Sequence, residues 1–388
     1  MVFARIIKKL LASGLMVLAC FTNAFADYQL NMTPGVTPIS QDIFRLHMTI
    51  FWICVVIGIV VFGVLFYSLY YHRKSRGVKA ATFHGNIRVE VFWAIVPFLI
   101  LVIMAIPATL VLMRMEDNSK ADVNIKVTGY QWKWQYEYLD EGINFYSNLS
   151  TPQEQINNKV PKNKWYLLEV DKPLVVPIHS KIRFLVTSND VLHSWWVPAL
   201  GIKRDAIPGF IHEAWARIEK PGIYRGQCAE LCGLNHGFMP IVVDARTQAD
   251  YQKWVQEQKT GVQQAAAAAT AQAAKVWTLQ ELMPEGEKIY NSQCAACHKP
   301  NGAGMPPAFP AMKGSSVATG PFSKHVDIVL HGKPGTAMVA FGPQLNDEDI
   351  AAVITYERNA WGNNNEKAYG PLAGGVVQPS DVAAARKK

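Results

Sequence analysis

Two long apolar runs near the N-terminal end of the chain are separated by a short basic segment. They are Phe51–Leu69 and Val91–Met113, and each approaches or exceeds the roughly 20 residues that a helix needs to cross a bilayer. Two arginines and two lysines lie between positions 73 and 79. Basic loops stay on the cytoplasmic side. The pattern therefore predicts a transmembrane hairpin within residues 27–120, with spans at about 46–70 and 91–113, and with the rest of the chain outside the cytoplasm.

From Asp122 to about Ala245 the pattern changes to short segments in which apolar and polar positions alternate, as they do in half-buried strands. The expected strands are Val123–Val127, Trp165–Val170, Lys181–Val186, Ala214–Ile218 and Pro240–Val243. Pro-Gly pairs at 208–209 and 221–222 mark turns. Short strands of this kind predict an all-β sandwich or barrel over residues 121–245.

Residues 278–362 are expected to form a small all-α domain, with helices at Glu285–Asn291 and Asp347–Glu357, the second capped by Asn346 or Asp347. Residues 246–277 form an Ala/Gln-rich linker of low complexity. Alanine-rich linkers are often partly helical, so a random coil is not expected there. The Gly-, Pro- and Ala-rich tail, residues 363–388, is expected to be mobile.

The first 26 residues have the pattern of a secretory signal peptide. A basic start and the apolar run Leu10–Phe21 precede the small-residue site Ala24-Phe25-Ala26. Cleavage there would begin the mature chain at Asp27. The weak lipoprotein-type box that ends at Cys20 leaves acylation of this residue as a lesser alternative.

Half of the 388 residues are hydrophobic, and the mean hydropathy is slightly positive. These values fit a chain whose partner is a lipid bilayer. The net charge of +8 is modest for this length and forms no basic stripe. We therefore expect no nucleic-acid partner.

One segment, Cys228–Met239, concentrates soft metal ligands. It contains two thiols, the imidazole of His236 and the thioether of Met239, a set suited to copper. Because two thiolates can bridge two ions, Cys228 and Cys232 favour a binuclear centre, and His193 is the natural second imidazole. A disulfide between the cysteines and a zinc site are the alternatives, but neither explains the nearby methionine.

A second motif, Cys294-Ala295-Ala296-Cys297-His298, is a c-type haem attachment sequence. The cysteines would form thioethers with the porphyrin, and His298 would ligate iron. The opposite axial ligand should be a methionine or histidine, and Met338 is favoured because it lies in a loop just before the last predicted helix. The other candidates are Met305, Met312, His325 and His331.

Together these features resemble subunit II of haem–copper cytochrome c oxidase, in the caa3-like variant with a fused C-terminal cytochrome c. The matching stretches are Val191–Trp195, Asp205–Gly209 and Gly226–Pro240. The resemblance implies a membrane-anchored multidomain protein in which a two-helix hairpin is followed by a cupredoxin-like sandwich and a cytochrome c domain.

The same resemblance implies the ligands of the binuclear centre, called CuA. Cys228 and Cys232 would bridge the coppers. His193 and Met239 would complete one copper. His236 and the backbone carbonyl of Glu230 would complete the other, and the Glu230 side chain would reach a magnesium ion shared with subunit I.

Two further residues match family positions. Trp132, within the aromatic run Tyr130–Tyr138, matches the tryptophan through which electrons reach CuA. Glu90 matches an acidic residue near the mouth of a proton path into subunit I, although an interfacial carboxylate at a helix start is an alternative. Arg204 and Lys203 make the surface near Asp205 less acidic than a patch for external cytochrome c would need.

The expected function is electron input to a terminal respiratory oxidase in the bacterial inner membrane, with both redox domains in the periplasm. The donor would be a periplasmic cytochrome c or another carrier, and the partners would be subunit I and subunit III. A CuA-containing nitric oxide reductase and a membrane-tethered electron carrier are the alternatives. The copper ligands disfavour a quinol oxidase, and the hairpin disfavours nitrous oxide reductase.

Overall fold

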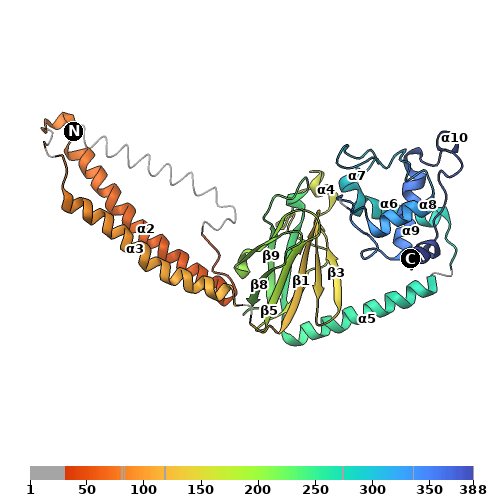
Figure 1. Ribbon diagram of the computed structural model, residues 1–388, viewed down its shortest axis with the longest axis horizontal. Coiled ribbons are helices and arrows are strands. Elements are labelled where there is room, and N and C mark those ends of the chain that lie inside the picture. Colours follow the sequence, from red (N-terminus) through yellow and green to blue (C-terminus); the bar gives the residue numbers. More distant parts are fainter. Residues whose placement is uncertain are drawn as a thin grey trace. The chain divides into compact units, whose positions relative to one another are not determined.

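The computed structural model describes residues 31–79, 82, 84–117, 119–272, 275–334 and 336–387 (Figure 1). The predicted signal peptide, residues 1–26 with Cys20, and the predicted start at Asp27 lie outside these residues. The chain divides into two compact units. Most of the two apolar helices lies in one, and everything from Ala105 onward lies in the other.

The apolar runs form two helices, α2 (Pro38–Tyr71) and α3 (Ile87–Met115), which are long and apolar enough to cross a membrane. Each is longer than the predicted span. The helix α3 begins after Asn86, whose side-chain oxygen accepts hydrogen bonds from the backbone N–H groups of Arg88 and Val89. Such a cap satisfies donors that have no partner within the helix.

The next part is a sandwich of two five-stranded sheets, with the orders β3-β2-β1-β5-β8 and β4-β10-β9-β6-β7 (Figure 1). The strands of the first sheet are β1 (Val123–Tyr130), β2 (Lys133–Tyr138), β3 (Ile143–Ser147), β5 (Lys181–Ser188) and β8 (His212–Arg217). Those of the second are β4 (Leu174–Pro177), β6 (His193–Val197), β7 (Ile202–Ala206), β9 (Gly222–Cys228) and β10 (Pro240–Arg246).

Alternation of side chains builds the core of the sandwich. In β5 every second residue is buried, because successive side chains of a strand point to opposite faces. Phe184 of β5 and Trp195 of β6 are fully buried, and their ring centroids are 4.9 Å apart. The two sheets therefore meet in one hydrophobic core.

The prediction of a strand at Trp165–Val170 is wrong. Residues around Leu167, which has a φ of 58°, form a turn, and the N–H of Leu168 donates to the carbonyl of Trp165. Only Val170 pairs, in an isolated bridge to Leu149. The Arg225 guanidinium covers the Trp165 ring at 3.8 Å. This segment therefore folds as a packed loop rather than as a paired strand.

The predicted linker is a helix, α5 (Gln248–Gln272), and its first half belongs to the sandwich. Tyr251, Trp254 and Val255 are buried in the sandwich core. The Lys259 ammonium lies 2.6 Å from the Glu141 carboxylate. The segment that can act as a linker therefore begins beyond Lys259.

The C-terminal part is helical, as predicted. Its main helices are α6 (Leu279–Ile289), α7 (Ala295–His298), α8 (Phe322–His331) and α9 (Asp347–Asn359). The predicted first helix, Glu285–Asn291, covers the end of α6 and part of a π-helical turn. Asn346 caps α9 and accepts a hydrogen bond from the N–H of Asp349.

The tail differs from the mobile segment expected from its composition. It forms α10 (Glu366–Tyr369) and α11 (Pro379–Arg386), and α11 packs on α8 and α9. Val377 and Val382 are buried in the helical core. A few well-spaced apolar side chains thus anchor a segment whose average composition is typical of disorder.

The crossing of α6 and α9 generates a prediction. A Cβ atom at Gly286 would lie 2.2 Å from the carbonyl oxygen of Ala352, so Gly286→Ala forces the helices apart. We expect the helical domain to lose about 1–3 kcal/mol of unfolding free energy, the usual cost of overpacking, measured by thermal melting. The control is Gly261→Ala in α5, where a Cβ meets nothing within 4 Å. It should be neutral or slightly stabilising, and equal losses in both variants would contradict the explanation.

Candidate metal centre

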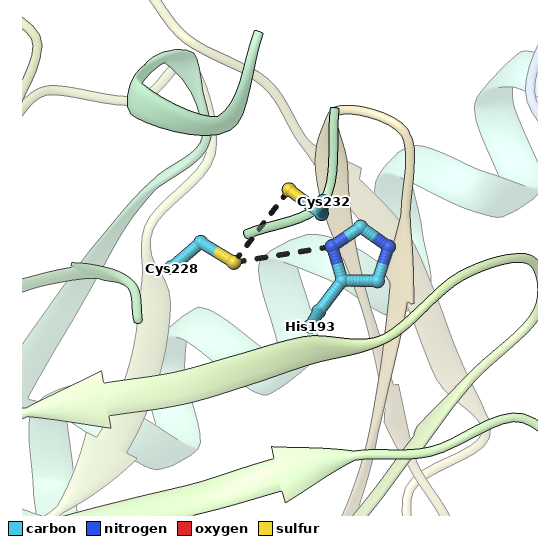
Figure 2. A group of neighbouring side chains, drawn as sticks. All are labelled: His193, Cys228 and Cys232. Atoms are coloured by element: carbon cyan, nitrogen blue, oxygen red, sulfur yellow. Dashed lines mark hydrogen bonds between the residues drawn. The ribbon is translucent and has the colours of Figure 1, made fainter. Parts of the chain in front are cut away.

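Three predicted ligands lie together at one end of the sandwich. The side chains of His193, Cys228 and Cys232 face one another (Figure 2), and their ligand atoms all lie within 4.8 Å. The Sγ atom of Cys228 is 3.8 Å from the Sγ of Cys232 and 3.9 Å from Nδ1 of His193. All three residues are buried.

The remaining predicted ligands surround this cluster. The Sγ of Cys232 lies 3.4 Å from Nδ1 of His236 and 3.5 Å from Sδ of Met239. The carbonyl oxygen of Glu230 lies 3.3 Å from the Sγ of Cys228. The structure therefore brings together all six groups that the sequence singled out.

The sheet positions these groups. Cys228 ends β9, and Met239 directly precedes β10, so the loop between them leaves and re-enters the sheet at adjacent places. The N–H of Cys228 donates to the carbonyl of Met239 at 3.3 Å, which closes the loop. His193 opens β6, where Trp195 pairs with Cys228. The ligands from the two segments thus meet through strand pairing.

Asp190 orients His193, although it was not among the residues predicted for the site. Its Oδ1 lies 2.9 Å from Nε2 of His193, and its Oδ2 accepts a hydrogen bond of 2.7 Å from the N–H of Gln131. Because Nε2 is engaged by the carboxylate, Nδ1 is the nitrogen left to face the thiols. An acidic residue three positions before a candidate histidine is the signal that could have identified it.

Trp132 lies one hydrogen bond away from the cluster. Its indole N–H donates to the carbonyl oxygen of Cys232 at 3.1 Å, and the Gln131 side-chain amide donates to the same oxygen at 2.9 Å. The indole is partly buried against the sandwich core. A through-bond path thus joins this ring to a predicted ligand residue.

The two thiols lie within hydrogen-bond distance of each other, so their ionisation is linked. Their hydrogen bond, first among several causes, lowers the pKa of Cys228 and raises the pKa of Cys232. One thiol therefore ionises while the other keeps its proton. A metal ion bound to both sulfurs would replace that proton, since a coordinating thiol is deprotonated.

The donor set fits two soft ions better than one. Two sulfurs, two imidazole nitrogens, a thioether and a carbonyl exceed the four ligands of a structural zinc site. Sulfur and imidazole donors suit copper. Cys228 and Cys232 are both free cysteines, so the disulfide alternative does not describe this structure.

The haem attachment motif lies at the start of the helical domain. Cys294 ends a π-helical turn, and Cys297 and His298 lie in α7. Nδ1 of His298 is 2.8 Å from the carbonyl oxygen of Pro310. A donated hydrogen bond from Nδ1–H leaves Nε2 as the nitrogen for iron, so the motif fits a covalently attached haem.

Among the candidates for the opposite ligand, the histidines have other partners. Nε2 of His325 lies 2.7 Å from the buried carboxylate of Glu357. Nδ1 of His331 lies 3.0 Å from the exposed carboxylate of Asp327. Met338 packs against the helical core. So does Met312, which leaves it as the alternative to Met338. Met305 pairs through its backbone with Phe309.

Comparison with known proteins gives three family matches. Residues 123–246 match the periplasmic domain of cytochrome c oxidase subunit II, and residues 26–111 match its transmembrane domain. Residues 281–356 match the family described as subunit III of cbb3-type cytochrome c oxidase. The periplasmic-domain family implies CuA, and the cbb3-type family implies haem c.

Similar proteins come from bacteria and plants. A probable cytochrome c oxidase subunit 2 of Rickettsia bellii is 38% identical over 236 residues, covering 61% of this chain and 86% of that protein. Subunit 2 of Arabidopsis thaliana is 39% identical over 240 residues, covering 61% and 92%. A crystal structure of the periplasmic domain of subunit II from Bradyrhizobium japonicum is 40% identical, with a TM-score of 0.33, and covers 37% of this chain and 96% of that one.

The packing of His193 generates a prediction. A Cβ atom at Gly129 would lie 2.8 Å from Cδ2 of the His193 ring, so Gly129→Ala should displace the imidazole. We expect the variant to fold but to retain less than half of the wild-type copper per chain, measured by metal analysis after dialysis. Gly237→Ala is the matched control, because a Cβ there meets nothing within 4 Å. Equal copper content in the two variants would show that the His193 position is not critical.

Proposed function

The chain belongs to the cytochrome c oxidase subunit II family, and from this premise we propose that it is the electron-input subunit of a terminal respiratory oxidase. It takes electrons from a periplasmic donor through haem c and CuA. It delivers them to the haem–copper site of subunit I, where oxygen is reduced to water with coupled proton translocation. The convergence of Cys228, Cys232, His193, His236 and Met239 carries this proposal.

We assign the ligands as the family pattern has them. Cys228 and Cys232 would hold both coppers through their thiolates. His193 and Met239 would ligate one copper, and His236 with the Glu230 carbonyl would ligate the other. When bound, the copper pair supplies a one-electron carrier whose charge is shared by two metals.

The surrounding hydrogen bonds limit movement of these ligands. Asp190 holds the His193 ring, and the carbonyl of Cys232 accepts two side-chain donors. Partners of this kind fix the orientation of ligands. A ligand set that cannot relax keeps the geometric change on electron transfer small, which favours fast transfer.

Trp132 is the proposed point at which electrons reach the centre. Its ring is joined to the ligand residue Cys232 by a hydrogen bond, and that bond offers a short path through the protein. In the helical domain, Cys294 and Cys297 would attach the haem, and His298 and Met338 would ligate its iron. The hydrogen bond from His298 to Pro310 supports the first of these axial ligands.

The helix α5 keeps the haem domain covalently connected to the CuA domain. A donor haem on the same chain as CuA has an effective concentration that is set by the length and stiffness of the linker. Only the part beyond Lys259 can act as linker, because the earlier part is packed on the sandwich. Transfer between the centres is then independent of protein dilution.

Exposed apolar side chains next to the ligands support docking to subunit I. Leu192 precedes His193, and Leu231 and Leu234 lie between the ligands Glu230 and His236. All three leucines are at least 47% exposed. Exposed apolar side chains that gather in one place typically mark interaction sites.

The remaining assignments follow the family. The hairpin α2–α3 supports a location in the bacterial inner membrane, with the two redox domains in the periplasm. Subunit III is a further partner, and the donor is a periplasmic cytochrome c or another electron carrier. The Glu230 side chain contributes to a magnesium site shared with subunit I. Glu90, in the first turn of α3, lies at the mouth of a proton path.

A first prediction tests the binuclear centre. Electron paramagnetic resonance of the purified complex should show one unpaired electron delocalised over two coppers, because two thiolates bridge them. Cys232→Ser should abolish this signal, since one bridge is lost. A wild-type spectrum of a single isolated copper would contradict the assignment. Metal analysis that finds zinc in place of copper would contradict it as well.

A second prediction tests the route. Truncation after Thr260 keeps the packed half of α5 and should leave CuA assembled, but it should slow turnover with the native donor by tenfold or more, because the haem is no longer on the chain. Turnover is measured as oxygen consumption by the complex, with nitric oxide as the comparison substrate. Preference for nitric oxide would indicate the alternative reductase.

The matching point variant is Trp132→Ala. It should slow haem-to-CuA transfer in flash kinetics while both spectra stay intact. Unchanged turnover in the truncated protein would show that external donors reach CuA directly and that the haem domain is dispensable.

A further inference from the structure

The last helix, α11, carries an arginine that contacts the segment following Met338. Arg386 donates to the carbonyl oxygens of Gly342 and Leu345, at 2.5 and 2.6 Å, and its Nε lies 2.5 Å from Oδ1 of Asp347. A planar guanidinium can hold several acceptors at fixed positions. One side chain therefore fastens both ends of the stretch between Gly342 and the start of α9.

The opposite side of this stretch is held by α8. The N–H groups of Phe341 and Gly342 donate to the carbonyls of Val329 and Leu330 at the end of that helix. A Cβ atom at Gly342 would lie 2.8 Å from the Leu330 oxygen and 3.3 Å from a guanidinium nitrogen of Arg386. The backbone is thus held closely between α8 and Arg386.

The helix that carries Arg386 is itself anchored. Val382 is fully buried between α11 and the helical core. Before α11, the side chain of Gln378 exchanges two hydrogen bonds with the backbone of Trp277, at 2.8 and 2.9 Å. The guanidinium of Arg358 donates to the carbonyl of Gly374 at 2.7 Å. The tail from Gly374 to Arg386 therefore forms a strap around the domain.

Met338 lies four residues before Gly342, and its backbone carbonyl accepts a hydrogen bond of 2.9 Å from the N–H of Lys333. A thioether can leave iron only if the loop that carries it moves. Holding the downstream end of that loop raises the free energy of the open form. The strap is thus placed to control how often the Met338 ligand is released.

We propose that Arg386 is a positioning residue that keeps the Met338 loop closed and so protects the haem iron from outside ligands. The proposal rests on the proposed function, because it takes Met338 as the axial ligand. It assigns a role to the Gly- and Ala-rich tail, which the electron route itself does not use.

Imidazole provides the test, because it binds ferric haem only where the thioether has left. Its apparent Kd varies inversely with the fraction of open loop. We use the full chain in detergent, with haem attached and without added copper or partner subunits. Arg386→Gln should lower the apparent Kd about tenfold, equivalent to ~1.4 kcal/mol of loop closure. Arg386→Lys, which keeps the charge but loses the fork, should fall between Arg386→Gln and wild type.

Two controls make the result specific. Lys387→Gln removes the same charge from the adjacent exposed residue and should leave the Kd unchanged. Met338→Ala should remove the weak sulfur-to-iron charge-transfer band and bind imidazole most tightly. Haem content and the melting temperature show whether each variant is folded.

The outcomes distinguish a failure of the Arg386 positioning role from a failure of the Met338 ligand assignment. If the band is present in wild type and lost in Met338→Ala, but Arg386→Gln binds imidazole with the wild-type Kd, the positioning role is overturned alone. A fall of equal size in Lys387→Gln would also overturn it, because net charge would then explain the effect. If Met338→Ala keeps the band, the ligand assignment fails and the inference fails with it.

Discussion

The hydrogen bond from the N–H of Cys228 to the carbonyl of Met239 is the constraint on which the ligand cluster depends. It extends the pairing of β9 and β10 by one residue, to the last residue of β9 and the residue before β10. The segment between these two ligands, which are eleven positions apart, is therefore a closed loop. The Trp134 indole donates to the same carbonyl at 3.3 Å from within the core. The soft ligands therefore converge because the sheet fixes both ends of the loop.

The ligand residues of the site were easier to predict than the strands around them. The ligand types and spacing from Cys228 to Met239 are chemical signals that depend little on tertiary structure. The apolar and aromatic residues of Trp165–Val170 are a weaker signal, because a packed loop can use the same residue types as a strand. Asp190 was missed as well. Its contact with His193 spans only three positions and could have been inferred from that spacing. The hydrogen bond from Gln131 that holds Asp190 in place comes from 59 positions away, and a single sequence does not reveal such contacts.

The C-terminal tail is folded, although its composition predicts a mobile segment. Glycine, proline and alanine suggest mobility when they are averaged over residues 363–388, but folding depends on where the few anchors fall. Val377 and Val382 enter the core, and the carbonyls of the glycine-rich stretch accept hydrogen bonds from the buried Arg358. By contrast, the two apolar helices were predictable because their length alone decides whether they can span a bilayer.

The docked first half of α5 has a consequence for how this chain tolerates insertions and deletions. Because Tyr251 and Trp254 fix the start of the helix in the core, its rotational phase is set there. Each residue then adds about 1.5 Å and about 100° of rotation. Deleting one residue after Lys259 rotates the helix end about its axis by more than a quarter of a turn. Deleting seven residues rotates it by only about 20°. Length variation in α5 is therefore expected to occur in helical steps rather than one residue at a time.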